Sequence, residues 1–371
     1  MKVLFISRST LFSGQGGDTV QMMKTAEHLR KLGIDVDIRR CDERIDYAPY
    51  DLLHFFNLIR PADILVHIFR SGKPYAVSPI FVDYAEFDAR IRTGQARLVF
   101  RYLPADWIEY LKVLGRRLHS GERIVSTRYL VWGHRRSVRY IIRHARCLLP
   151  NSHSEYRRLV AHFGLEQQYR VVPNAVETGL FVPPAAEGDR DPRLVLCVGR
   201  IEGIKNQMGL IRALNDSPYS LCLIGSPAPN QPAYHAACQA LAAQNIRFIP
   251  QVSQEELVRY YAAAGIHVLP SWFETTGLSS LEAAAMGCRV VITDKGDTRE
   301  YFGDEAVYCD PASPESIRDA VDRAASGPPP EGLARRIRER FTWERAAAET
   351  AAAYQAIVSS PFPRTAAGTS G

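Results

Sequence analysis

The chain has 371 residues, which is too long for one ordinary hydrophobic core and predicts two domains. A hydrophobic fraction of 46% and a charged fraction of 23% are those of a soluble globular protein, not of a disordered or fibrous chain. The net charge is +6, but residues 90–158 hold 16 Arg or Lys against four acids, which predicts a surface that meets an anionic partner.

In the first half, short apolar runs alternate with helical patterns, which is typical of a parallel α/β sheet. An amphipathic helix is expected at Thr19–Leu32, where Gly33 ends it. Residues 84–145 are basic and aromatic and show no clean period. Strands are expected at Val3–Ile6, Val36–Ile38, Leu52–Phe55, Tyr75–Val77 and Cys147–Pro150.

In the second half the alternation is clearer, and a helix is expected at Leu278–Met286. Strands are expected at Leu194–Gly199, Ser220–Ile224, Arg247–Ile249, His267–Leu269, Val290–Thr293 and Val307–Cys309.

The proline-rich segment 181–192 predicts a linker between domains at residues 1–180 and 193–342. A last helix at 343–359 is expected to return to the first domain, and residues 360–371 are expected to be disordered.

The seven cysteines are scattered and form no C-x-x-C pair, which predicts buried reduced thiols and neither a disulfide framework nor a zinc site. The N-terminal apolar run is too short for a signal peptide, and no stretch has the length of a membrane span. These features predict a cytoplasmic location.

Two cations flank a predicted turn between a strand and a helix. Arg200 and Lys205 follow the strand Leu194–Gly199, where free backbone N–H groups and the helix dipole favour an anion. They are candidates to hold a diphosphate and to neutralise the charge that grows on it when it leaves. The alternative is an ordinary loop with solvated charges.

Gly16 and Gly17 lie between the first strand and the first helix, where adjacent glycines let the backbone approach a ligand closely. A dinucleotide fingerprint is a rival interpretation, but Thr19 replaces its third glycine and the loop begins several residues after the strand. Nicotinamide or flavin binding is therefore disfavoured. The loop could also serve only as a turn.

Two carboxylates eight residues apart, Glu274 and Glu282, follow the predicted strand His267–Leu269. They would lie at the carboxyl edge of a parallel sheet, where α/β proteins bind ligands, and they suit the hydroxyls of a sugar and a ribose. The backbone N–H groups of Gly277 and Leu278 would open toward the same ligand. Because Glu282 stands on an otherwise apolar helix, it needs a partner, either a ligand hydroxyl or a salt bridge.

These motifs together resemble the nucleotide-sugar site of glycosyltransferase family 4, over residues 160–358 and the first forty. The most specific matches are Val198-Gly-Arg-Ile-Glu-Gly-Ile-Lys-Asn206 and the stretch from Leu269 to Val291. The resemblance implies a GT-B fold, with two Rossmann-like domains facing a central cleft. It also implies a retaining enzyme that needs no metal or other cofactor and uses a nucleotide sugar as co-substrate.

The resemblance also implies roles for the matched residues. Arg200 and Lys205 would bind the donor diphosphate and act in catalysis with Glu274, which faces the transferred sugar together with the backbone of Gly277 and Leu278. Glu282 would hold the ribose hydroxyls, and Gly16 and Gly17 would approach the phosphates or the acceptor. In one departure from the family, the first domain lacks the histidine at the end of its fourth strand, where this sequence has Ile80.

The expected function is transfer of a sugar to a hydroxyl acceptor in cell-envelope polysaccharide or glycolipid synthesis. The alternatives are a non-catalytic sugar-nucleotide-binding or scaffolding protein and a nucleotide-sugar epimerase. Within the basic region 90–158, which would contact an anionic membrane on its inner face, residues 130–146 mix apolar and basic residues near helical spacing. The alternatives for this segment are that it grips an acidic glycan or phosphate, or that it is an ordinary helix that packs on one side and is solvated on the other. No recognition motif for nucleic acid accompanies it.

Overall fold

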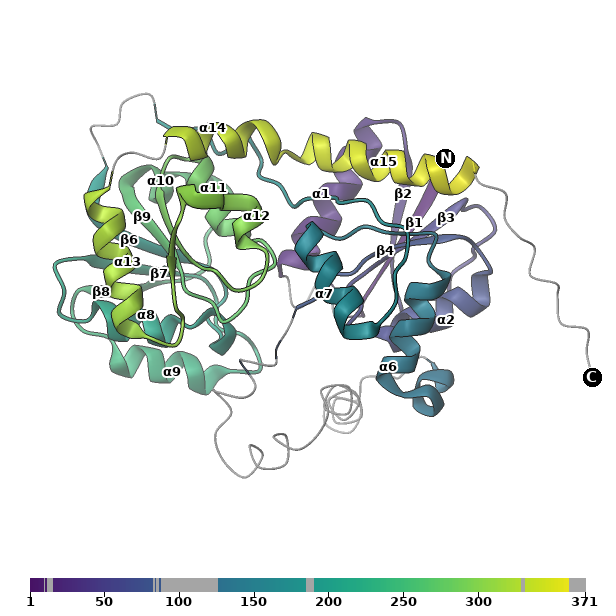
Figure 1. Ribbon diagram of the computed structural model, residues 1–371, viewed down its shortest axis with the longest axis horizontal. Coiled ribbons are helices and arrows are strands. Elements are labelled where there is room, and N and C mark those ends of the chain that lie inside the picture. Colours follow the sequence, from purple (N-terminus) through teal and green to yellow (C-terminus); the bar gives the residue numbers. More distant parts are fainter. Residues whose placement is uncertain are drawn as a thin grey trace, which may run out of the picture. The chain divides into compact units, whose positions relative to one another are not determined.

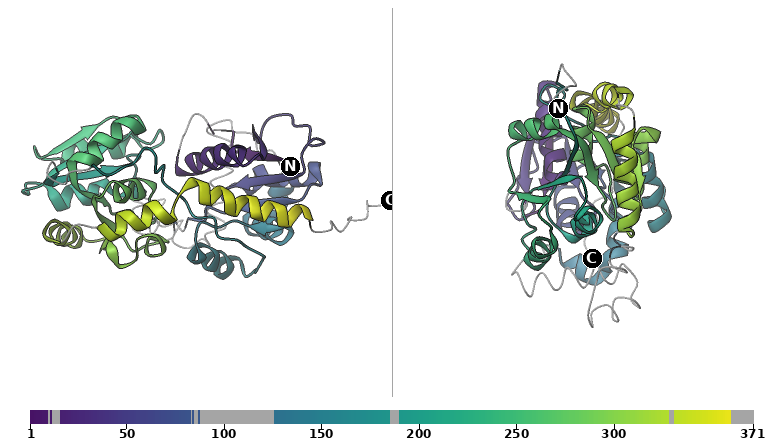
Figure 2. Two further views of the ribbon diagram at one scale, coloured as in Figure 1. Left: turned by 90° about the horizontal axis from the view of Figure 1, so that it is seen from above. Right: turned by 90° about the vertical axis from the view of Figure 1, so that its left-hand side faces the viewer.

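The computed structural model describes residues 1–9, 11, 16–82, 84, 87, 126–184, 190–327 and 331–359. They form two compact units, each with one parallel β-sheet and helices on its faces (Figures 1 and 2). The first unit takes Met1–Phe81, the described part of Pro104–Val172, and the chain from Ala347 on. The second takes Pro173–Ala346 with the described part of Val82–Leu103. The expectation of two parallel-sheet α/β domains is confirmed.

The first unit has a five-stranded sheet in the order β2-β1-β3-β4-β5. The chain pairs β1 with β2 on one side and then with β3 on the other, so the direction of winding reverses between β1 and β3. The strands are β1 (Lys2–Ser7), β2 (Asp35–Arg40), β3 (Leu52–Phe56), β4 (Tyr75–Ser78) and β5 (Cys147–Leu148). The helices are α1 (Gly17–Lys31), α2 (Pro61–Ser71), α6 (Thr127–His144) and α7 (His153–Phe163).

The last helix, α15 (Trp343–Ser359), contributes to the core of the first unit. All five residues of β3 are buried, which is typical of a strand covered on both faces. One of them, His54, carries its Nδ1 2.6 Å from the hydroxyl of Tyr354 on α15 and its Nε2 2.9 Å from Ser78 Oγ. Both ring nitrogens of this buried imidazole are therefore paired.

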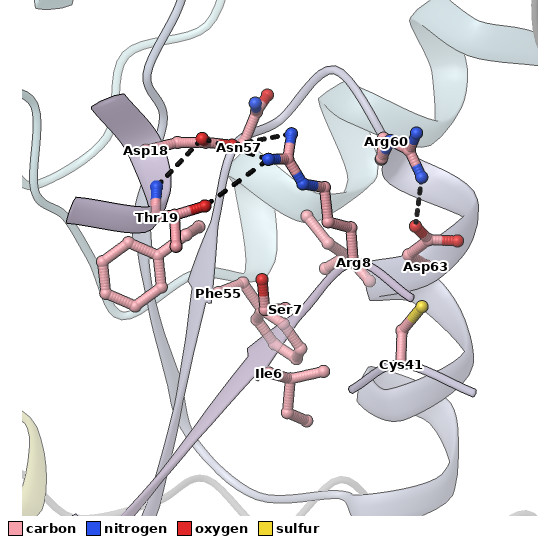
Figure 3. Close-up of a pocket in the computed structure, with 12 residues that line it drawn as sticks. Ile6, Ser7, Arg8, Asp18, Thr19, Cys41, Phe55, Asn57, Arg60 and Asp63 are labelled. Atoms are coloured by element: carbon pink, nitrogen blue, oxygen red, sulfur yellow. Dashed lines mark hydrogen bonds and ion pairs between the residues drawn. The ribbon is translucent and has the colours of Figure 1, made fainter. Parts of the chain in front are cut away.

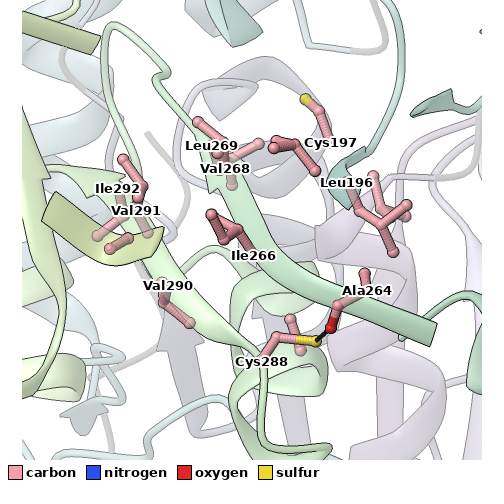
Figure 4. Close-up of a cluster of buried hydrophobic side chains, with 14 of the residues drawn as sticks. Leu196, Cys197, Ala264, Ile266, Val268, Leu269, Cys288, Val290, Val291 and Ile292 are labelled. Carbon is pink, nitrogen blue, oxygen red and sulfur yellow. Dashed lines mark hydrogen bonds between the residues drawn. The ribbon is translucent and has the colours of Figure 1, made fainter. Parts of the chain in front are cut away.

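The second unit has a six-stranded sheet in the order β11-β10-β9-β6-β7-β8. Its apolar core is built largely on the central strands, for example by Leu196, Ile266 and Val291 (Figure 4). The strands are β6 (Asp191–Val198), β7 (Ser220–Ile224), β8 (Ile246–Ile249), β9 (Ala264–Leu269), β10 (Arg289–Thr293) and β11 (Val307–Cys309). The helices are η2 (Gly203–Lys205), α8 (Gln207–Leu214), α9 (Pro232–Leu241), α10 (Gln254–Ala263), α11 (Leu278–Ala285), α12 (Thr298–Phe302), η3 (Gly303–Glu305), α13 (Pro314–Ser326) and α14 (Glu331–Arg340).

Some expected boundaries need correction. β5 ends at Leu148, before Pro150, which has no N–H to donate to a sheet. β6 begins at Asp191, so the last residues of the expected linker belong to a strand, and it ends before Gly199, whose φ of 154° starts the turn. Within the aperiodic stretch, α6 is a helix interrupted at Gly133, where φ is 71°.

Several other expectations concern single features. All seven cysteines are buried and free. Among the described residues, no helix has the length and apolar character that crossing a membrane requires. Residues 185–189 of the expected linker, residues 88–125 of the basic region and the expected disordered tail 360–371 lie outside the described residues.

Candidate functional site

The loops that follow β6 and β9 meet at one edge of the second sheet. These strands are parallel neighbours, with Val195 opposite Ile266 and Leu196 opposite His267. From β6 the chain passes to β7 and β8 on one side and then to β9 on the other, which is a topological switch point. The crevice outside the carboxyl ends of the strands at such a point is where open α/β sheets bind ligands.

Lys205 and Glu274 form the centre of this edge. The Lys205 Nζ lies 2.5 Å from Glu274 Oε1, and the Ser271 hydroxyl donates to the same oxygen at 2.6 Å. Glu274 is only 5% exposed, whereas a quarter of the Lys205 side chain is accessible. The structure therefore joins a buried carboxylate from one loop to a partly accessible ammonium from the other.

The backbone around Glu274 is held tightly. Its N–H donates to the Lys295 carbonyl at 3.2 Å, and its own carbonyl accepts from the Asp297 N–H at 2.9 Å. Gly296 lies between these partners with φ 96°, and a Cβ on it would fall 2.0 Å from the Glu274 carbonyl oxygen. Only glycine fits this close approach, so the carboxylate is presented by a rigid loop.

The loop after β6 is tied to the end of β9 by Asn206, a contact that the sequence did not indicate. Asn206 adopts left-handed backbone angles (φ 56°, ψ 35°) between η2 and α8. Its side-chain amide donates to the carbonyls of Pro270, at 3.2 Å, and Pro311, at 2.8 Å. These bonds fix the position of Lys205, its neighbour in sequence, against the β9 loop.

Arg200 has a different partner from Lys205. Its Nε lies 3.4 Å from Glu202 Oε2, and about a third of its side chain is exposed. Its carbonyl accepts from the Gln207 side-chain amide at 2.9 Å, which fixes the turn. In the described part of the chain no ion pair joins Arg200 to Glu274, so the structure brings together two of the three expected catalytic residues and leaves Arg200 on the accessible side of the loop.

Gly277 and Leu278 open helix α11. Gly277 has φ 76°, and a Cβ there would lie 3.2 Å from Ile292 Cδ1. Among the described residues, the N–H groups of Gly277 and Leu278 donate no hydrogen bond. Thr276, which precedes them, is held in place by Asn174, whose side-chain amide donates to Thr276 Oγ1 at 3.0 Å. The free amides at this helix start favour an anionic or hydroxylated ligand.

Glu282 finds its partner in Tyr261, a residue that sequence reasoning missed. The Tyr261 hydroxyl donates to Glu282 Oε2 at 3.0 Å, and no salt bridge to Glu282 is formed within the part of the chain that the structure describes. Burial of the carboxyl raises its pKa to about 7, although the bond from Tyr261 acts in the opposite direction. An aromatic residue on the buried face of α10 gives no signal in sequence that its hydroxyl meets a carboxylate.

Gly16 and Gly17 belong to the first unit. Gly16 precedes α1 and Gly17 is its first residue, and the Gly16 carbonyl accepts from the N–H groups of Thr19 and Val20. The preceding loop residues 12–15 lie outside the described residues. At the end of β4 the chain has Ile80, with φ 48°, in the place where a histidine is missing.

Comparison with known proteins assigns the segment that carries Lys205 and Glu274 to a family. Residues 183–341 match the family described as glycosyl transferases group 1. This segment belongs to the group 1 glycosyltransferases. Arg200, Gly277, Leu278 and Glu282 also lie inside the matched range, and Gly16 and Gly17 lie outside it.

Relatives of this group 1 segment include two proteins named D-inositol 3-phosphate glycosyltransferase. The one from Acidothermus cellulolyticus is 30% identical over 200 residues, which are 47% of this chain and 45% of that protein. The one from Geodermatophilus obscurus is 32% identical over 252 residues, or 58% and 54% of the two chains. The chain thus spans about half the length of these relatives.

Solved structures of glycosyltransferases share the fold over almost the whole chain. Sucrose-phosphate synthase from Thermosynechococcus elongatus superposes with a TM-score of 0.73 at 17% identity, covering 96% of this chain and 98% of that one. Anabaena HepE in complex with UDP and glucose gives a TM-score of 0.67 at 15% identity, covering 96% and 100%. The expected GT-B fold is therefore confirmed, and at these identities the likeness concerns the fold alone.

Proposed function

We propose that this protein is a glycosyltransferase that moves a sugar from a nucleotide-sugar donor to a hydroxyl acceptor with retention of configuration. The observation that carries the proposal is the Lys205–Glu274 contact at the switch point of the second sheet. The names of the relatives and the UDP-bound neighbour support it, because they describe glycosyl transfer and binding of a nucleotide in proteins of this family or fold.

Each part of the nucleotide-sugar donor would bind to different residues of the second unit. The diphosphate would lie against Lys205 and Arg200, which supply two positive charges on the accessible side of the loop. The transferred sugar would lie toward Glu274 and the free amides of Gly277 and Leu278. The ribose hydroxyls would reach Glu282 on the next turn of α11, beside the Tyr261 hydroxyl.

The chemistry follows from these positions. The bond between the anomeric carbon and the diphosphate oxygen breaks, and the acceptor oxygen forms its bond to the same face of that carbon. The acceptor proton passes to the departing phosphate oxygen, so no protein base is required. Lys205 and Arg200 stabilise the charge on the diphosphate, which is the role a metal ion would otherwise fill. Glu274 orients the sugar.

We propose that the protein binds its acceptor at the surface of an anionic membrane. Helix α6 contains five arginines and no acid, and Arg128, Arg135, Arg136 and Arg143 are exposed. Val131, between them, is 83% exposed. An exposed apolar side chain within a basic helix favours an interfacial position on anionic lipid. A lipid-linked or polysaccharide acceptor of the cell envelope would be reached there.

Donor binding is tested by the melting temperature with UDP-glucose, GDP-mannose, ADP-glucose and dTDP-glucose, with EDTA present throughout. One nucleotide sugar should stabilise the native protein and not the Glu282→Ala variant, whereas the exposed control Glu339→Ala should respond like the native protein. With a membrane extract as the source of acceptor, NMR of the product would then determine the anomeric configuration of the transferred sugar. Absence of any shift, or an inverted product, contradicts the proposal.

Membrane binding is tested by sedimentation with vesicles. The native protein should sediment with phosphatidylglycerol-containing vesicles and not with pure phosphatidylcholine, and added salt should release it. Replacing Arg135 and Arg136 by Gln should abolish sedimentation. The control replaces two exposed arginines of α14, Arg335 and Arg340, by Gln and should sediment normally. Equal loss in both double variants, or no sedimentation at all, contradicts a site on α6.

A further inference from the structure

Charged side chains at the carboxyl edge of the first sheet are paired with one another. Arg8 Nη1 lies 3.1 Å from Asp18 Oδ2, and Arg60 Nη1 lies 3.7 Å from Asp63 Oδ2 (Figure 3). The cavity beside them has a volume of about 20 Å³, which is room for about one water molecule. Behind the candidate donor site of the second unit, by contrast, the Nδ1 of His267 is buried and makes no hydrogen bond to any described residue.

His267 lies on β9 and contacts the two helices α10 and α11. Its Nε2 lies 3.1 Å from the hydroxyl of Ser280 in the first turn of α11, and both side chains are fully buried. Its ring also meets the ring of Tyr261 edge-on, with 6.1 Å between the two centroids. Because Tyr261 donates to Glu282, this one imidazole lies against both polar contacts that hold α11 at the site.

Ser280 lies directly against the turn that opens α11. Its backbone N–H donates to the Gly277 carbonyl at 2.9 Å. A Cβ on Gly277 would fall 3.3 Å from Ser280 Oγ, 3.2 Å from Ile292 Cδ1 and 3.4 Å from Leu269 Cδ2. The turn is therefore packed against side chains of β9, β10 and α11, and Ser280 supplies the polar atom of this contact. A shift of Ser280 would move the N–H groups of Gly277 and Leu278 with it.

Burial alone does not account for an imidazole at this position. Burial lowers the His267 pKa to about 3, so the ring is neutral near pH 7 and carries a single N–H. Either the Ser280 hydroxyl donates to Nε2 or Nε2 donates to that hydroxyl, and in both tautomers Nδ1 stays unpaired. An unpaired buried polar atom destabilises the fold, and a leucine would avoid it. What the imidazole adds, and a leucine cannot, is the directional bond to Ser280.

We propose that His267 is a positioning residue: through Ser280 it fixes the left-handed turn at Gly277 and thereby orients the free N–H groups of Gly277 and Leu278 toward the donor sugar. The part of this inference that concerns the sugar rests on the proposed function. His267 itself does not touch the ligand, since no part of it is exposed. Its loss should therefore weaken binding of the transferred sugar and spare the diphosphate, which would lie against the loop after β6.

The test uses isothermal titration calorimetry on the full chain with UDP-glucose, GDP-mannose, ADP-glucose and dTDP-glucose, each compared with its nucleoside diphosphate. His267→Leu should weaken the nucleotide sugar that binds the native protein about tenfold, the scale of one lost hydrogen bond, and should leave its nucleoside diphosphate within about twofold. His267→Gln, whose amide nitrogen can take the place of Nε2, should restore the affinity. His267→Asn, whose amide lies nearer the place of Nδ1, should not. Ser280→Ala removes the same bond by a smaller change and should reproduce the loss.

The matched control is His67, an equally buried imidazole of the first unit. Its Nδ1 lies 2.7 Å from the Tyr47 hydroxyl, and its Nε2 lies 3.1 Å from the Cys41 carbonyl. His67→Leu should lower stability toward urea, because it removes two buried hydrogen bonds, and it should leave both affinities unchanged.

Hydrogen exchange of the ligand-free protein is a second measurement that does not depend on the donor. The backbone N–H groups of Ser280 and Leu281 both donate to the Gly277 carbonyl, so their exchange reports on the turn. Exchange at these two residues should be faster in His267→Leu and Ser280→Ala than in the native protein, and His267→Gln should return it to the native rate.

The outcomes separate this inference from the proposed function. If exchange changes as expected but none of the nucleotide sugars binds the native protein, His267 positions the turn and the proposed function is wrong. The inference itself is overturned if His267→Leu and Ser280→Ala leave exchange and affinity at native values. It is also overturned if nucleotide sugar and nucleoside diphosphate lose affinity equally, or if folded His267→Gln behaves like His267→Leu.

Discussion

The Lys205 ammonium lies 2.5 Å from the Glu274 carboxylate, although 69 residues separate them in the chain. Glu274 also accepts from Ser271, so its Oε1 has two donors in the absence of a ligand. A diphosphate that approaches the accessible side of Lys205 adds a second anion to the same ammonium. The carboxylate then limits how far Lys205 can move toward the phosphate, and it couples the position of the sugar to that of the leaving group.

Neutralising this carboxylate should damage turnover far more than folding. Glu274→Gln keeps the shape and the acceptor for Ser271 but removes the charge that orients Lys205. We expect turnover of the stabilising nucleotide sugar to fall about 100-fold, the scale seen when one charge-stabilising group is lost. Unfolding free energy should change by only about 1–2 kcal/mol, because Lys205 is partly solvated.

The control for this change is Glu339→Gln on α14, an exposed carboxylate with no ion pair among the described residues. Steady-state rates and urea unfolding curves of both variants separate the two effects. A Glu274→Gln enzyme that turns over within a factor of three of the native rate would show that this carboxylate has no part in the reaction.

Glu282 should make stability depend on pH. Burial raises its pKa from 4.5 in the unfolded chain to about 7 in the folded protein. Between these values the folded state keeps a proton that the unfolded state has released, so the native protein loses stability as pH rises to about 7 and then levels off. In Glu282→Gln this loss is absent. Its stability relative to the native protein should therefore increase from pH 5 to pH 8, by up to about 3 kcal/mol.

Urea unfolding of both proteins at pH 5, 6, 7 and 8 measures this difference, with Glu339→Gln as the control whose difference stays constant. The affinity for UDP-glucose at the same pH values is a second measurement, because the diphosphate of UDP-glucose does not titrate between pH 5 and pH 8. If ribose hydroxyls donate to the Glu282 carboxylate, native binding should strengthen as pH approaches 7, and binding by Glu282→Gln should stay flat. A stability difference that is the same at all four pH values would place the Glu282 pKa outside this range.

Substituting two glycines that have left-handed backbone angles distinguishes the effect of backbone strain from the effect on ligand binding. Gly277 (φ 76°) opens α11 at the candidate donor site, and Gly72 (φ 60°) ends α2 in the first unit. Alanine at either position should cost about 1 kcal/mol of stability, because a Cβ is disfavoured in this conformation. Only Gly277→Ala should also weaken nucleotide-sugar binding, because its Cβ crowds Ile292 and shifts the two free amides. Equal affinity in the two variants would contradict a role for these amides.

The positions of most strands are predictable from the sequence, whereas the site is predictable only in part. Buried strands such as β3 and β9 are apolar except for His54 and His267, because helices cover both faces of their sheets. The near-helical spacing of residues 130–146 indicates part of α6, but the break in the helix at Gly133 is not evident from this spacing. The alternation of strands and helices along the sequence also does not specify the order of the strands within each sheet. The contact between Lys205 and Glu274 depends on the pairing of β6 with β9, which local patterns do not specify.

The same limit applies to partners of buried polar groups. Glu282 is conspicuous on an apolar helix, and the need for a partner follows from the cost of burying a carboxylate. Its partner Tyr261 lies on a different helix, and the approach of α10 to α11 comes from packing on the sheet. Asn206 and Asn174 likewise bind groups that are distant in sequence. Sequence reasoning therefore finds the ligand-facing charges more readily than the residues that hold them in place.

The bond between Tyr354 and His54 predicts how the last helix stabilises the first unit. Burial lowers the His54 pKa to about 3, so the folded imidazole stays neutral at pH values where the unfolded one, near 6.5, is protonated. This contribution to stability is complete above pH 6.5 and is lost as pH falls toward 3. At neutral pH, Tyr354→Phe leaves His54 Nδ1 without its partner and should lower the unfolding free energy by about 1–3 kcal/mol. Tyr140→Phe, which removes a hydroxyl in the same unit with no hydrogen bond among the described residues, should change it by less than about 0.5 kcal/mol. Urea unfolding at pH 7.5 measures both stabilities, and equal stability of the two variants would show that the Tyr354–His54 bond does not help to hold α15 on the first unit.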